Sequence, residues 1–100
     1  MHVADCESGD GTQGSARQFN DNGTVLRGTA NRQDVGYFQI NEHYHLKAAK
    51  RLGYDIYTEE GNISYALYLY QTSGLSPWSA SKGCWGGSQA PPSQRLAANE

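Results

Sequence analysis

The segment Asp34-Val35-Gly36-Tyr37-Phe38-Gln39-Ile40-Asn41 stands near the middle of the chain, where the character of the sequence changes. A glycine between an acid and an aromatic pair is typical of a β-strand whose backbone comes close to another segment. Before this segment the chain is rich in turn residues, and after it the apolar residues take up helical spacing. The segment therefore marks the passage from a small β-region to a helical part.

Toward the N-terminus, residues 17–27 predict a β-hairpin. Strand-forming residues stand on both sides of Asn20-Asp21-Asn22-Gly23, and the Asn-Gly pair favours the positive backbone angles of a tight turn. Residues 2–9 predict the last turns of a helix, with Gly9 as its stop.

Toward the C-terminus, two helices are predicted. In the first, which ends at Gly53, we expect Leu46, Ala49 and Leu52 to face inward. Thr58 caps the second, which Gly74 ends. Its predicted inward stripe is Ile63, Ala66, Leu67 and Tyr70.

The fold class expected from these patterns is α+β, mostly α. Residues 1–85 form one domain that closes with a compact aromatic stretch, in which Trp78 and Trp85 pack beneath the last segment. Residues 86–100 have almost no large apolar side chains and predict a disordered tail.

Composition excludes several partners. A formal net charge of −2 gives no basic footprint for nucleic acid. No apolar run approaches the roughly 20 residues of a transmembrane helix, so we expect no membrane insertion. Met1–Asp5 lacks the apolar stretch of a secretory signal, so we expect a removed signal or another route of export.

Two cysteines, Cys6 and Cys84, stand near opposite ends of the predicted domain. One hypothesis is a disulfide, which the chain-entropy model values at roughly 4 to 5 kcal/mol, and the other is two free thiols. The pair lacks the spacing of a structural zinc site, and we expect His43 and His45 to be solvated helix residues. We therefore expect neither a metal nor a cofactor.

A second motif, Cys6-Glu7-Ser8-Gly9, adds weight to the central segment. With both motifs in this order across a turn-rich stretch, residues 3–85 resemble the lysozyme-like superfamily. Its members place a catalytic glutamate in a Glu-Ser-Gly context at a helix end. A small β-region and a Gly-aromatic/aliphatic-Gln-Ile motif follow. The resemblance implies a lysozyme-like fold with a small β-hairpin beside a catalytic cleft.

Three branches of the superfamily compete. The c-type lysozymes carry Asp-X-Gly-X-X-Gln-Ile-Asn, similar to residues 34–41, but differ in the spacing from Glu7 and in having four disulfides. Lytic transglycosylases carry a helix similar to residues 62–69, with glycine usual where Ala66 stands. Resuscitation-promoting factors share the Cys-Glu-Ser-Gly motif near their start. They end in Trp-Pro-X-Cys, which resembles Pro77-Trp78 followed by Cys84 in this chain. That last likeness also favours the disulfide.

The resemblance implies a muramidase that cuts the β-1,4 bond between N-acetylmuramic acid and N-acetylglucosamine in peptidoglycan. Glu7 would be the general acid and Asp34 the second carboxylate, since a desolvated carboxyl group keeps its proton near neutral pH. Gln39 would either orient substrate or satisfy buried backbone groups. The remaining candidate substrate contacts are Ser8, Tyr37, Tyr68 and Tyr70.

Two alternatives stay open beside the muramidase. One is a lytic transglycosylase that uses Glu7 alone and leaves anhydro ends, and the other is a glycan-binding module without turnover. In each case we expect a monomer located outside the cell or in the cell envelope.

Overall fold

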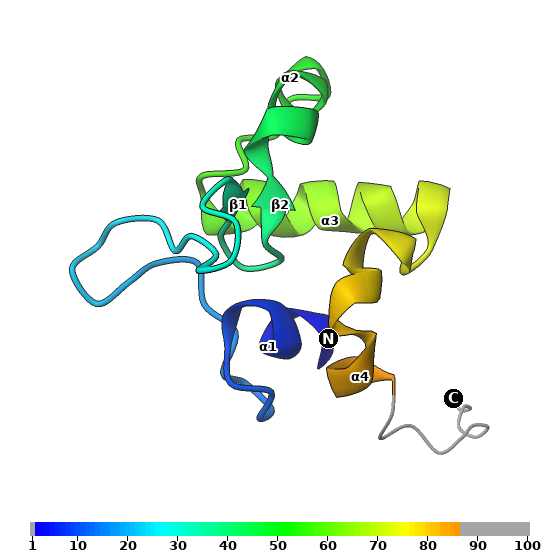
Figure 1. The fold of residues 1–100 in the computed structure, drawn as a ribbon. Helices are drawn as coiled ribbons and strands as arrows, with labels where there is room; N and C mark the ends of the chain where they lie inside the picture. The colour runs from blue at the N-terminus through cyan, green and yellow to red at the C-terminus, as the bar shows by residue number, and fades with distance from the viewer. Residues whose placement is uncertain (1, 87–100) are drawn as a thin grey trace.

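A computed structural model describes residues 2–86, which form four α-helices, one 3-10 helix and one antiparallel sheet of two strands (Figure 1). The expected fold class, α+β and mostly α, is confirmed at this level. The predicted tail falls almost wholly on residues 87–100, outside the described residues. The elements are α1 (His2–Ser8), β1 (Asp34–Val35), β2 (Ile40–Asn41), α2 (Glu42–Arg51), α3 (Glu59–Ser73), η1 (Ser76–Ser81) and α4 (Lys82–Trp85).

The two-stranded sheet lies inside the central segment, not in the predicted hairpin. β1 and β2 pair Asp34 with Asn41 and Val35 with Ile40, and the chain turns between them. Residues 17–27 reverse direction as predicted, but their strand pairing is limited to isolated bridges, one between Phe19 and Val25 and one between Arg27 and Val35 of β1. The predicted hairpin is therefore present as a chain reversal, but its two arms form isolated bridges in place of regular strands.

Polar side chains in the loop account for the lost strands. The Asn22 side chain accepts from the backbone N–H of Thr24 at 3.1 Å, and the Asn20 amide donates to the Thr24 hydroxyl at 3.0 Å. Such local bonds offer the backbone an alternative to a β-ladder. The loop keeps its turn and two backbone hydrogen bonds across it, from Asn20 to Thr24 and from Leu26 to Gln18, but forms no regular strands.

The predicted start and end of α2 are confirmed, but one of its predicted core residues is not. The Asn41 side chain caps its first turn by accepting from the backbone of Tyr44 at 3.1 Å, and Gly53 ends it with φ +88°. Ala49 is buried as expected, whereas Leu52 is 45% exposed. Leu52 is the C-cap, so it has already left the inward face of the helix.

The boundaries of α3 are confirmed, but only two of its four predicted inward residues are: Ala66 is buried, and Ile63 packs partly buried against the core. Thr58 caps the helix by accepting from Gly61, and Gly74 stops it with φ +64°. Leu67 and Tyr70 are 49% and 48% exposed. The buried residues are Gly61, Asn62, Tyr65, Ala66 and Leu69.

The misplaced face has a physical cause. Apolar residues occur around nearly the whole of α3, so more than one stripe fits the helical period. Buried polar contacts at the start of the helix, described below, fix its rotation about its own axis.

α1 and α4 lie on one side of α3 and α2 on the other (Figure 1). α1 packs against η1 and α4. The Cys6–Cys84 disulfide, with a sulfur–sulfur distance of 1.98 Å, links α1 to α4. Trp78 is buried and Trp85 packs half-buried against the core, as expected. Among the described residues, no helix has the length and apolar character needed to cross a membrane.

Candidate functional site

The last turn of α1 places Glu7 in a hollow between α1, the central segment and η1. This first hollow has a volume of about 140 Å³. It is lined by Glu7, Asp34, Gln39, Ile40, Asn41, His45, Leu69, Pro77, Trp78 and Ala80.

A second hollow adjoins the first, because both are lined by Glu7, Asp34 and Gln39. Its volume is about 310 Å³, and its far side is the irregular loop of residues 26–31. A third hollow shares Ser8 and Gly9 with the second. The hollows therefore follow one another across the surface, and the two candidate carboxylates lie where the first and second meet.

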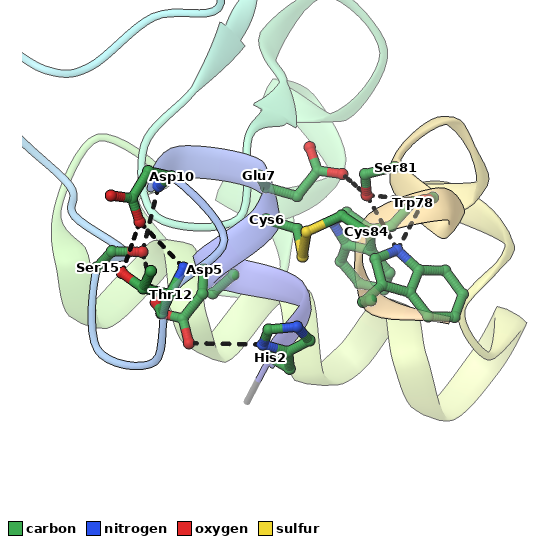
Figure 2. Close-up of a disulfide and its surroundings, with 12 residues drawn as sticks. His2, Asp5, Cys6, Glu7, Asp10, Thr12, Ser15, Trp78, Ser81 and Cys84 are labelled. Carbon is green, nitrogen blue, oxygen red and sulfur yellow. Dashed lines mark hydrogen bonds and ion pairs between the residues drawn. A yellow bond between two sulfur atoms is a disulfide. The ribbon is translucent and has the colours of Figure 1, made fainter. Parts of the chain in front are cut away.

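The environment of Glu7 favours its protonated form. Burial raises the pKa of Glu7 above its ordinary value, and the charge of Asp34 raises it further. The Ser81 hydroxyl, which donates to Glu7 Oε2, acts in the opposite direction but does not reverse the shift. Figure 2 shows this bond, with one carboxylate oxygen directed at Ser81 and the other turned away.

Asp34 enters the site from β1, opposite α1. It is half-buried, and its Oδ1 accepts from the side-chain amide of Asn41 at 2.9 Å. Asn41 is the register partner of Asp34 in β2, so the short sheet itself orients the carboxylate. The two candidate carboxylates come from segments far apart in sequence, and the fold brings them to the same hollows.

Gln39 satisfies a backbone group, one of the two roles considered for it, and it also borders the hollows. Its side-chain amide donates to the backbone carbonyl of Gly36 at 3.1 Å, and it also lines the first and second hollows. Its backbone has φ +52°, the only positive φ of a non-glycine residue among residues 2–86. Such a conformation costs of order 1 kcal/mol or more and persists where surrounding contacts impose it.

Two buried amides impose the shape of the turn between β1 and β2. Gln18 accepts from the backbone of Tyr37 at 2.8 Å and donates to the carbonyl of Ile56 at 3.1 Å. Asn62 accepts from the backbone of Phe38 at 2.8 Å and donates to the carbonyls of Val35 and Ile56. Both side chains are almost fully buried, and together they fasten the turn to the start of α3.

Of the other four predicted substrate contacts, only Ser8 lines any of the three hollows. Ser8 lines the second and third hollows, where its hydroxyl donates to Ala4 and accepts from the backbone of Arg17. Tyr37, Tyr68 and Tyr70 do not line any of these three hollows. Tyr68 and Tyr70 are instead exposed on α3, and the Tyr68 ring lies against that of Tyr65.

His45 is a site residue that the sequence patterns did not predict. It is half-buried in the first hollow, its Nδ1 lies 2.8 Å from the Tyr65 hydroxyl, and burial lowers its pKa. The expectation of a solvated histidine was therefore wrong. Its spacing of four residues from Ala49 places both on one helix face and was the available clue.

The sequence patterns also did not predict the contact of Ser81 with Glu7, nor the side chains that hold the 26–31 loop in place. No local pattern links Ser81 to an acid 74 positions away. Arg27, which lines the second hollow, donates to Glu42 Oε2 at 2.9 Å, and the Tyr57 hydroxyl donates to Oε1 of the same carboxylate at 2.7 Å. This cluster ties the loop to the start of α2.

His2 lies close to the sulfur atoms of Cys6 and Cys84, and their donor atoms fall within 4.8 Å of one another. In the structure the two sulfurs are bonded to each other, so neither is the thiolate that a metal ion binds. The Nδ1 atom of His2 lies 3.9 Å from the Asp5 carboxylate (Figure 2).

Searches with the whole chain against protein-family models, curated proteins and solved structures found no match.

Proposed function

We propose that the chain is a glycosidase of peptidoglycan, a muramidase with a lysozyme-like fold, in which Glu7 is the general acid and Asp34 the second carboxylate. One observation carries the proposal: Glu7 is half-buried, its pKa is raised, and it shares two adjoining hollows with a second carboxylate. Active sites are where burial and like charges commonly combine to shift a pKa.

The arrangement suits glycosidic bond cleavage. A protonated Glu7 gives its proton to the leaving oxygen as positive charge grows on the sugar ring. Asp34, held by Asn41, then stabilises that charge or bonds to the anomeric carbon. The deprotonated Glu7 next activates a water molecule, which completes hydrolysis and restores the acid.

The hollows adjoin one another along the surface, an arrangement that suits a polymeric substrate. The carboxylates lie at the junction of the first and second hollows, so a glycan laid across them has sugars on both sides of the bond to be cut. Gln39 borders both hollows and offers an amide for the acetamido groups of such sugars.

Digestion of purified peptidoglycan by the Glu7→Gln variant tests the proposal. We expect release of soluble fragments to fall at least about 100-fold, since general acid catalysis contributes 10² to 10⁴ in rate. Glu60→Gln is the matched control, because Glu60 is an exposed glutamate in the first turn of α3. Equal digestion by the wild type and Glu7→Gln would remove Glu7 from the mechanism.

Product analysis separates the muramidase from its alternatives. Reducing muramic ends indicate hydrolysis, and anhydro ends indicate a lytic transglycosylase that uses Glu7 alone. Asp34→Asn should abolish hydrolysis, with Asp21→Asn as the exposed control. Retention of the chain on insoluble peptidoglycan without any cleavage would favour a glycan-binding module.

A further inference from the structure

The Ser81 hydroxyl stands at the centre of a small hydrogen-bond network beside Glu7. It donates to Glu7 Oε2, and its oxygen lies 3.1 Å from the backbone carbonyl of Trp78. The indole N–H of Trp85 donates to the same oxygen at 2.9 Å and also to the Trp78 carbonyl at 3.2 Å. All of these partners except Glu7 belong to η1 and α4.

A hydroxyl group has one proton to donate, so its two possible acceptors compete. The Glu7 carboxylate is the stronger one when it is charged, because a hydrogen bond to a charged group is about twice as strong as one between neutral groups. Donation from Trp85 occupies a lone pair of the Ser81 oxygen. The network therefore prepares Ser81 to act as a donor toward Glu7.

We propose that Ser81 is a positioning residue for Glu7, whose donation to Oε2 leaves Oε1 as the oxygen that carries the acid's proton. Oε1 is the oxygen turned away from Ser81 in Figure 2. The catalytic consequence rests on the proposed function: the proton sits on the oxygen that is free to meet a glycosidic bond. Ser81 itself transfers no proton.

The disulfide keeps the two partners together. Cys6 directly precedes Glu7, and Cys84 lies three residues after Ser81, so the Cys6–Cys84 bond fixes the distance between the two segments (Figure 2). Ser81 and Glu7 are 74 positions apart and meet only because α1 packs against η1 and α4.

The first experiment is an NMR titration of the wild-type chain with labelled glutamate and tryptophan side chains. The Trp85 indole proton should shift with the same midpoint as the Glu7 carboxyl carbon, because one oxygen atom separates them. The Trp78 indole, which donates to the buried carbonyl of Phe38, is the internal control. The Trp85 step should vanish in Glu7→Gln.

The second experiment compares Ser81→Ala with Ser81→Thr, which keeps the hydroxyl. Loss of the donor should raise the pKa of Glu7 in Ser81→Ala, move the alkaline limb of kcat/KM to higher pH and lower kcat about tenfold with KM unchanged. The threonine variant should restore all three. Ser76→Ala is the matched control, because Ser76 also bonds to a carbonyl three residues back but does not touch Glu7.

The other titratable side chains around Glu7 are Asp34 and His45 in the first hollow and Arg27 in the second. Any Trp85 step that persists in Glu7→Gln comes from a group other than Glu7. Two results would overturn the proposal. One is a Trp85 indole resonance that does not shift at the midpoint of the Glu7 titration, and the other is a folded Ser81→Ala variant in which the pKa of Glu7 is unchanged. If the NMR coupling is present but peptidoglycan stays intact, the proposed function fails while the role of Ser81 stands.

Discussion

Glu7 is a carboxyl group that the fold keeps partly out of water. Its raised pKa means that the folded chain holds the Glu7 proton more tightly than the unfolded chain does. The resulting contribution to stability is fully present below the ordinary pKa of 4.5 and is lost as pH rises through the higher folded value.

Replacement of Glu7 by the neutral isostere glutamine should therefore stabilise the chain at neutral pH. The Tm of Glu7→Gln relative to wild type should rise between pH 4 and pH 7, as measured by thermal unfolding in matched buffers. Glu60→Gln should show no such gain, because Glu60 is exposed at a helix N-terminus, where negative charge is favourable. A difference that stays flat with pH would show that Glu7 is not desolvated.

At the scale of the elements, the turn between β1 and β2 depends on a close approach that only glycine permits. Gly36 has φ +76°, and a β-carbon there would lie 2.5 Å from both terminal atoms of the Gln18 amide. Gly23 has φ +88°, but a β-carbon at that position would meet nothing within 4 Å. Alanine at either position strains the backbone, but only at Gly36 does it also overlap with neighbouring atoms, so a comparison of the two variants separates the two effects.

Gly36→Ala should destabilise the chain by about 3 kcal/mol or more, from left-handed strain plus overpacking, while Gly23→Ala should cost about 1 kcal/mol from strain alone. The free energy of unfolding from urea titration measures both. Similar losses in the two variants would mean that the buried amides adjust to the extra atom. Loss of peptidoglycan cleavage should accompany Gly36→Ala, because Gln39 and Asp34 flank this turn.

At the scale of the whole molecule, the Cys6–Cys84 disulfide links residues 78 positions apart. A chain of this length buries a modest share of its surface, so removal of a constraint on the unfolded state has a large relative effect. The double variant Cys6→Ser/Cys84→Ser should lose about 4 kcal/mol of unfolding free energy. Reductant should destabilise the wild type and leave the double variant unchanged, and a loss below about 1 kcal/mol would contradict the prediction.

Local chemistry in the sequence predicted much of the fold. The cap at Thr58 and the stops at Gly53 and Gly74 were predictable because capping depends on one or two side chains and a backbone angle. Glu7, Asp34 and Gln39 were predicted from a family resemblance that two short motifs carry, and the structure brings all three to the same hollows. Their roles in catalysis remain predictions.

Tertiary structure alone determined the rest. The rotation of α3 was set by Asn62, which bonds to segments that no helical period describes. The tyrosines Tyr68 and Tyr70 lie on the exposed side of that helix for the same reason. Ser81 reaches Glu7 only through the packing of the chain's two ends. Sequence patterns report interactions between near neighbours, whereas these contacts join residues far apart along the chain, and only the folded backbone brings them together.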